Sequence, residues 1–141
     1  MNPYRLYAAG GILAVEAPIV EGVIPGGFTR REGPHHITLL DIDDGKAIRA
    51  SRGLSTRAYE AMLDAIESAG SGPFGSPVRL GIGMATSGEN IAYFEVFDWH
   101  EAQRWRAAHF SLGRKDFHAT LYYFGADVRG VAKDVSSIVL P

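Results

Sequence analysis

The 141-residue sequence contains no cysteine, so it cannot form a disulfide, use a thiolate as a nucleophile or bind a metal through sulfur. It also lacks a charge excess, because 14 basic and 16 acidic side chains leave a net charge of −2 at pH 7. A protein that coats long duplex nucleic acid usually carries a basic face, so this balance argues against that class. A small anionic ligand held by a few local cations is compatible with it.

Long apolar runs are absent as well, since none approaches the roughly 20 residues that a membrane helix needs. The apolar run near the N-terminus is short and is broken by Gly10 and Gly11, so we interpret it as a strand of the mature protein. Because 46% of the residues are hydrophobic, the chain can bury an ordinary core. We expect a soluble, cytoplasmic protein in which residues 1–141 form a single domain.

Periodicity predicts two helices. Apolar residues recur at helical spacing over 56–69, and Gly70 supplies a stop. A second helix is expected over about 98–110, where Asp98 and Glu101 have the spacing of a capping box. Both helices are followed by strand-like sequence, so they separate groups of strands along the chain.

Strands are predicted from alternation and from β-branched and aromatic residues. The range 78–97 reads as a hairpin, with Val78, Leu80, Ile82 and Met84 on one face of its first strand. The other expected strands are 35–42, 117–124 and 136–140, with a further strand or turn near 19–24. Hairpins mixed with helices indicate an α+β fold. The order of elements suggests two lobes related by an approximate twofold axis.

Two of the predicted strands contain the same phrase, a histidine, any residue, a threonine and a leucine. Residues 36–39 read HITL, and residues 118–121 read HATL. Residues two apart in a strand project from the same face, so the histidine and threonine of each phrase project together. The apolar residues between them point the other way, into a core. If the two strands lie side by side, both pairs line one cleft.

Such a cleft suits in-line attack on a phosphodiester. Two imidazoles can divide acid–base work near neutral pH, one as base and one as acid. Two hydroxyls can donate hydrogen bonds to oxygens that gain negative charge. The candidate catalytic residues are His36 and His118, and the candidate substrate-binding residues are Thr38, Thr120 and Tyr122. Tyr122 is included because period two places it on the face of His118 and Thr120. We expect no metal and no cofactor.

Four basic side chains precede the two phrases and could help to attract an anion, although charges of this kind are more often simply solvated in loops: Arg30, Arg31, Arg114 and Lys115. The remaining histidines are expected to have structural or surface roles: His35, His100 and His109. A third phrase of similar form, HFSL at 109–112, falls at the end of the second predicted helix. Because it does not lie in a strand, we interpret it as a coincidence.

The paired phrases resemble the signatures of the 2H phosphoesterase superfamily, which includes 2′,3′-cyclic nucleotide phosphodiesterases and RNA 2′,5′-ligase-like enzymes. The text from Ser111 to Ser137 is also similar to the end of small bacterial members. The resemblance implies a bilobal fold, with two antiparallel-sheet lobes, helices outside and a central cleft carrying both phrases. More sequence precedes the first phrase than in a typical member, so the resemblance does not fix the strand order of the first lobe.

The resemblance also implies an activity. It implies metal-independent hydrolysis of a 2′,3′-cyclic phosphate on a nucleotide or RNA end, as in RNA processing. One histidine would act as base and the other as acid, and both threonines would hold the phosphate. The expected partner is therefore a small nucleotide or an RNA terminus, without a membrane or long duplex nucleic acid.

Two other functions fit parts of the sequence. The text HHITLLDID resembles the opening strand of vicinal-oxygen-chelate metal enzymes, in which His36, Glu95 and His118 would hold a divalent ion. This alternative leaves the threonine of the second phrase unexplained. A protein that binds nucleotides or RNA ends without turnover would use the same cleft residues as the enzyme.

Overall fold

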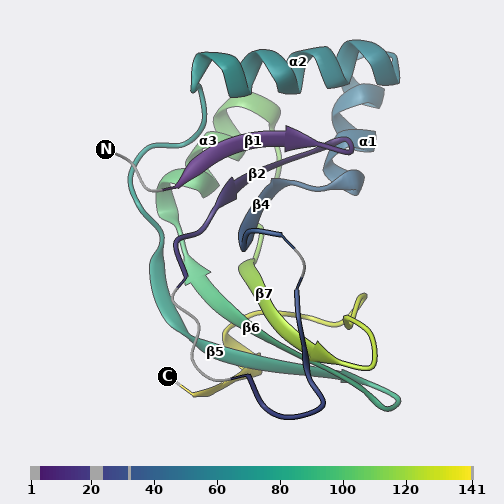
Figure 1. The fold of residues 1–141 in the computed structure, drawn as a ribbon. Coiled ribbons are helices and arrows are strands. Elements are labelled where there is room, and N and C mark those ends of the chain that lie inside the picture. The colour runs from purple at the N-terminus through teal and green to yellow at the C-terminus, as the bar shows by residue number, and fades with distance from the viewer. Residues whose placement is uncertain (1–3, 20–23, 32, 141) are drawn as a thin grey trace.

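The computed structural model describes residues 4–19, 24–31 and 33–140 (Figure 1). Within these ranges the elements follow one another as β1 (Arg5–Ala9), β2 (Ile12–Glu16), β3 (Thr29–Arg30), β4 (His36–Leu40), α1 (Ile42–Arg52), α2 (Thr56–Ala69), β5 (Val78–Ser87), β6 (Asn90–Asp98), α3 (His100–Phe110), β7 (Phe117–Phe124) and β8 (Ile138–Leu140). The strand or turn expected near 19–24 falls largely outside the described residues.

The strands form two antiparallel sheets, which confirms the α+β prediction. One has the order β1-β2-β4, and the other has the order β3-β7-β6-β5-β8. The three helices gather around the smaller sheet in Figure 1. Side chains from all three enter the larger apolar cluster beneath that sheet. A smaller cluster lies on the five-stranded sheet and centres on Phe94 and Val128. The twofold relation between the lobes stays a prediction.

Helix α1 is absent from the sequence prediction, which continued a strand through Ile42. The strand ends at Leu40 because Asp41 caps a helix. Its carboxylate accepts a hydrogen bond from the Asp44 backbone N–H at 2.8 Å, and the Asp44 carboxylate accepts one from the Asp41 backbone N–H at 3.0 Å. This reciprocal pair satisfies two N–H groups that a helix start otherwise leaves without partners. Gly53 ends the helix in the left-handed conformation, with φ of 64°.

Helix α2 has the bounds predicted from its periodicity. Ser55 caps its start and Gly70 ends it in the left-handed conformation. Helix α3 starts later than predicted, and the expected capping box of Asp98 and Glu101 is wrong. Asp98 still belongs to β6, where it pairs with Val78, and Trp99 occupies the cap position without a side-chain hydrogen bond. Burial of the Trp99 ring, which is 1% exposed, fixes this junction instead.

The hairpin of β5 and β6 matches the prediction for 78–97, but the expected single apolar face of β5 is wrong. A β-bulge between Arg79 and Gly81 reverses the alternation, so Val78 lies on the opposite face from Ile82 and Met84. Val78 is 60% exposed and Met84 is 37% exposed. The predicted N-terminal strand is in fact the hairpin of β1 and β2. Among the described residues, no helix is long and apolar enough to cross a membrane.

Candidate active site

Strand β4 presents the first phrase as period two predicts. It pairs with β2, where His36 lies opposite Glu16 and Thr38 lies opposite Ala14. The alternate residue Ile37 is fully buried in the larger core, whereas His36 and Thr38 stay partly exposed. The apolar side of the strand therefore holds it in place, and its polar side is free to meet a ligand.

Strand β7 presents the second phrase in the same way. His118 lies opposite Val96 of β6, and Thr120 lies opposite Phe94. The Phe94 ring contacts the His118 ring edge to face, with centroids 5.9 Å apart. Ala119, between the two polar residues, is fully buried in the larger core. The side chains of His118 and Thr120 thus share one face of the five-stranded sheet.

The two phrases meet at one cleft of about 590 Å³. Its lining includes all four polar residues of the phrases: His36, Thr38, His118 and Thr120. The rest of the lining is Ile12, Arg31, Asp41, Ile42, Asp43, Asp127, Val128, Arg129, Gly130, Val131 and Lys133. Two imidazoles and two hydroxyls from separate sheets therefore face the same space, as the sequence predicted for strands lying side by side.

A buried histidine ties the two strands together. The Nδ1 atom of His35 lies 2.9 Å from the carbonyl oxygen of Thr120. A carbonyl oxygen only accepts hydrogen bonds, so His35 donates from Nδ1 and carries its proton there. The His35 side chain is 4% exposed, which agrees with the structural role predicted for it. This bond links the residue before His36 to the backbone of the second phrase.

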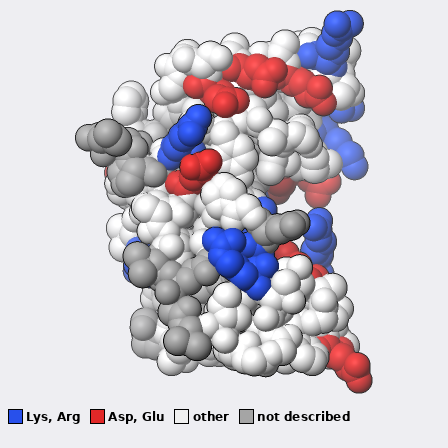
Figure 2. Space-filling view, in the orientation of Figure 1, with Lys and Arg blue, Asp and Glu red and all other residues white. Residues whose placement is uncertain are grey.

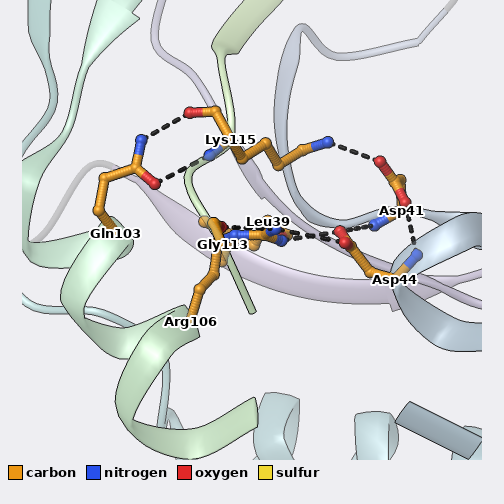
Figure 3. A network of polar contacts seen from close by, with 7 residues as sticks. All are labelled: Leu39, Asp41, Asp44, Gln103, Arg106, Gly113 and Lys115. Atoms are coloured by element: carbon orange, nitrogen blue, oxygen red, sulfur yellow. Dashed lines mark hydrogen bonds and ion pairs between the residues drawn. The ribbon is translucent and has the colours of Figure 1, made fainter. Parts of the chain in front are cut away.

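An ion pair makes a second link between the phrases (Figure 3). The ammonium of Lys115, three residues before His118, lies 2.7 Å from the carboxylate of Asp41, which directly follows β4. The backbone of Lys115 is held in turn by the side chain of Gln103 on α3, through bonds of 2.6 Å and 3.0 Å. The segment that leads into β7 is therefore attached to the end of β4.

Arg106 forms the buried centre of the same network (Figure 3). Its guanidinium pairs with both carboxylate oxygens of Asp44 at 2.7 Å and 3.2 Å, and it donates to the carbonyl oxygens of Leu39 and Gly113. The side chain of Arg106 is 4% exposed. One buried cation thus joins α3, α1, the end of β4 and the segment that leads into β7.

Burial makes His36 a weak base in the free protein. Its pKa is lowered from 6.5 to about 4, chiefly by burial and then by electrostatic interaction with Arg31 and His35, while the backbone of Pro34 opposes this lowering. The Nδ1 atom of His36 is buried, which leaves Nε2 as the ring nitrogen that can face the cleft. His36 is therefore neutral at pH 7.

The pKa of His118 is lowered to about 4 for similar reasons. Burial has the largest effect, followed by the ammonium groups of Lys133 and Lys115; the backbone of Asp116 and the carboxylate of Asp127 oppose them. Both imidazoles are thus neutral at pH 7 in the free protein. A negatively charged ligand in the cleft would favour the protonated form of each ring, because an opposite charge nearby raises the pKa of an imidazole.

Tyr122 does not belong to this group, and its predicted position is wrong. A β-bulge at Leu121 reverses the alternation of β7, because Phe94 pairs with Thr120 while the preceding Tyr93 pairs with Tyr122. Tyr122 consequently lies on the opposite face from Thr120. Its ring packs against Tyr93, with centroids 5.4 Å apart, and against Phe28 at 5.6 Å. It is absent from the lining of the cleft.

The cations that line the cleft differ from those predicted. Arg31 does line it, whereas Arg30, Arg114 and Lys115 do not. The segment after β7 contributes three charged residues that the sequence analysis overlooked: Asp127, Arg129 and Lys133. The sequence feature that could have indicated these residues is the segment 125–134, GADVRGVAKD, in which glycines and charged residues follow the second predicted strand. In the view of Figure 2, basic side chains gather near the middle of the molecule, and a band of acidic side chains lies over α2.

The set required by the metal-enzyme alternative is not assembled. Glu95 pairs with Ala119 across β6 and β7, so it lies on the opposite face of the sheet from His118. Its carboxylate forms an ion pair with Arg79. Among residues 4–19, 24–31 and 33–140, no group of three or more His, Asp or Glu side chains is arranged to hold a metal ion. His36, Glu95 and His118 therefore do not form one ligand set.

Comparison with known proteins identifies the family. The family model described as "2H-SAK: Swiss Army Knife, 2H phosphoesterase domain" matches residues 24–128. Neither the comparison with curated proteins nor the comparison with solved structures found a match. The matched range is well over half of the chain and includes both histidine–threonine phrases, which confirms the resemblance seen in the sequence. The chain belongs to the 2H phosphoesterase family.

Proposed function

We propose that this protein hydrolyses a 2′,3′-cyclic phosphate on a nucleotide or RNA end, by two-histidine acid–base catalysis without a metal. The single observation that carries the proposal is the cleft in which His36, Thr38, His118 and Thr120 meet. A phosphodiester placed there has an imidazole available for each of the two proton transfers that hydrolysis requires. It also has hydroxyl donors for its non-bridging oxygens.

The proposed reaction proceeds by in-line displacement. One neutral imidazole takes a proton from water as the water oxygen attacks phosphorus. The bond from phosphorus to one ribose oxygen breaks on the opposite side, and the other imidazole, in its protonated form, gives that oxygen its proton. The product is a nucleoside monophosphate with a free neighbouring hydroxyl. Proton exchange with solvent then restores the starting state of both rings.

The proposal is tested with 2′,3′-cyclic mononucleotides and with short RNA oligomers that end in a 2′,3′-cyclic phosphate. The assay should be run with and without a metal chelator. We expect hydrolysis of at least one of these substrates and the same rate in chelator. Absence of turnover on every substrate would contradict the proposed activity, and loss of turnover in chelator would contradict the metal-free mechanism.

Threonine variants should lower the rate without abolishing it. Thr38→Val and Thr120→Val each keep the shape of the side chain and remove one hydroxyl donor. We expect kcat for a 2′,3′-cyclic mononucleotide to fall about tenfold to a thousandfold, as for loss of one transition-state hydrogen bond. Thr86→Val is the matched control, because Thr86 is an exposed strand residue outside the cleft. Equal rates for all three variants would exclude both hydroxyls from transition-state binding.

The pH dependence should differ between kcat/KM and kcat. The base is lost as pH falls through its pKa, and the acid is lost as pH rises through its pKa. Because both pKa values are about 4 in the free protein, the optimum of kcat/KM should lie on the acid side of neutrality. Bound phosphate raises both pKa values, so the optimum of kcat should lie at higher pH. A flat profile from about pH 5 to pH 9 would oppose this scheme.

A further inference from the structure

The cleft wall beside His118 contains a nearly buried ammonium. The side chain of Lys133 is 9% exposed and lines the cleft that holds both histidines. Its ammonium lies 5.6 Å from the centre of the Phe94 ring, and the same ring contacts His118. A lysine this deeply buried is uncommon without a partner for its charge. Its position therefore requires an explanation.

The segment that carries Lys133 is fixed over the sheet. Val128 is 1% exposed and belongs to the small apolar cluster of β5 and β6. Gly125 and Gly130 adopt φ of 78° and 72°, which allows the chain to turn on either side of this anchor. At the end of the segment, the Asp134 carboxylate accepts a hydrogen bond from the Ser136 backbone N–H at 2.9 Å. Lys133 is thus held against the cleft by its own segment.

The ion pair of Lys133 uses only some of the hydrogen-bond donors of its ammonium. Its Nζ lies 3.4 Å from a carboxylate oxygen of Asp127, at the long end of hydrogen-bond distances. The Asp127 side chain is 29% exposed, so solvent weakens this pair. An ammonium has three donors, and this contact uses one of them. The remaining donors can serve an anion in the cleft.

We propose that Lys133 is a substrate-binding residue whose ammonium contacts a non-bridging oxygen of the cleaved phosphate, on the side of His118. The proposal rests on the proposed function and adds a residue to the same site. Lys133 lies beyond residues 24–128, the range that matches the family model. It would supply the cleft with a fixed charge for a phosphodiester anion.

The same ammonium opposes protonation of His118. The charged groups around that ring are Lys133, Lys115 and Asp127, and the two lysines outweigh the carboxylate. When a phosphate oxygen binds Lys133, the negative charge compensates the ammonium, and the imidazolium form of His118 becomes more favourable. Removal of the Lys133 charge should therefore raise the pKa of His118 in the free protein.

The test compares Lys133→Met, which keeps the apolar stem, with Lys133→Arg, which keeps the charge. For a hydrolysed 2′,3′-cyclic mononucleotide, kcat/KM should fall about tenfold to a hundredfold in the methionine variant, as for loss of a charge-assisted hydrogen bond. The arginine variant should recover part of this loss. The His118 pKa measured by NMR should rise in the methionine variant. Lys46→Met, at an exposed position on α1, is the matched control and should leave both quantities unchanged.

A purely structural Lys133 would give a different result. The methionine variant would then lose stability in urea while kcat/KM stayed at the wild-type value, and this outcome would overturn the inference. A second measurement needs no variant: adenosine 2′-monophosphate should shift the Lys133 side-chain NMR signals of the wild-type protein. Shifts at His118 without shifts at Lys133 would also overturn it. Wild-type protein that hydrolyses no cyclic phosphate would instead refute the proposed function.

Discussion

Replacement of His36 or His118 by alanine should reduce kcat/KM for a 2′,3′-cyclic phosphate about a hundredfold to ten-thousandfold, which is the usual contribution of a positioned acid or base. Each ring lies on the polar face of a strand whose other face is buried in the core. The alanine variants should therefore fold, because the residues that hold the strands are unchanged. Steady-state kinetics and circular dichroism measure the two effects separately.

The matched control for these variants is His100→Ala. His100 is an exposed residue at the start of α3 and lies outside the cleft, so its loss should leave turnover unchanged. Wild-type turnover in either the His36 or the His118 variant would contradict the paired acid–base scheme. A wild-type protein that binds nucleotides tightly without hydrolysing them would instead favour the non-catalytic alternative.

The Asp44→Ala variant should lose about 3–5 kcal/mol of folding free energy, as expected when one partner of a buried ion pair is removed. Arg106 is 4% exposed and Asp44 is 14% exposed, so solvent can replace little of the lost interaction. Asp44 also completes the capping box at the start of α1. Urea denaturation measures the change, and Asp64→Ala on the exposed side of α2 is the control.

The double variant Arg106→Met/Asp44→Ala separates the charge effect from the cap. If the buried guanidinium without its carboxylate causes most of the loss, removal of both groups should recover part of the stability. If instead the double variant loses as much free energy of unfolding as the two single variants added together, the two residues act independently. That result would contradict the network drawn in Figure 3.

The sequence predicted that the histidine and threonine of each phrase share one face of their strand, because the rule behind this prediction is local. Residues that are two positions apart in a strand share a face. The fully buried Ile37 and Ala119 confirm that the positions between histidine and threonine face the core. That the two strands meet at one cleft could not be read from this rule. It depends on long-range links, such as the bond from His35 to the carbonyl of Thr120 and the ion pair of Lys115 with Asp41.

The same rule failed where the backbone departs from regular geometry. The bulge at Leu121 turned Tyr122 away from the cleft, and one extra residue in a strand leaves no distinct mark in the side-chain pattern. Helix α1 was missed because Ile42 continued an apolar run, although Asp41 and Asp44 have the residue types of a helix cap. Lys133 was missed because a loop has no period from which its direction can be predicted.

A crystal structure of the protein with adenosine 2′-monophosphate or 3′-monophosphate, a product of the proposed reaction, would show whether the two phrases form one phosphate site. We expect one phosphate group between the two strands, with a ring nitrogen of both His36 and His118 within about 3 Å of its oxygens. A phosphate group bound elsewhere on the protein, or in contact with only one of the two rings, would contradict it.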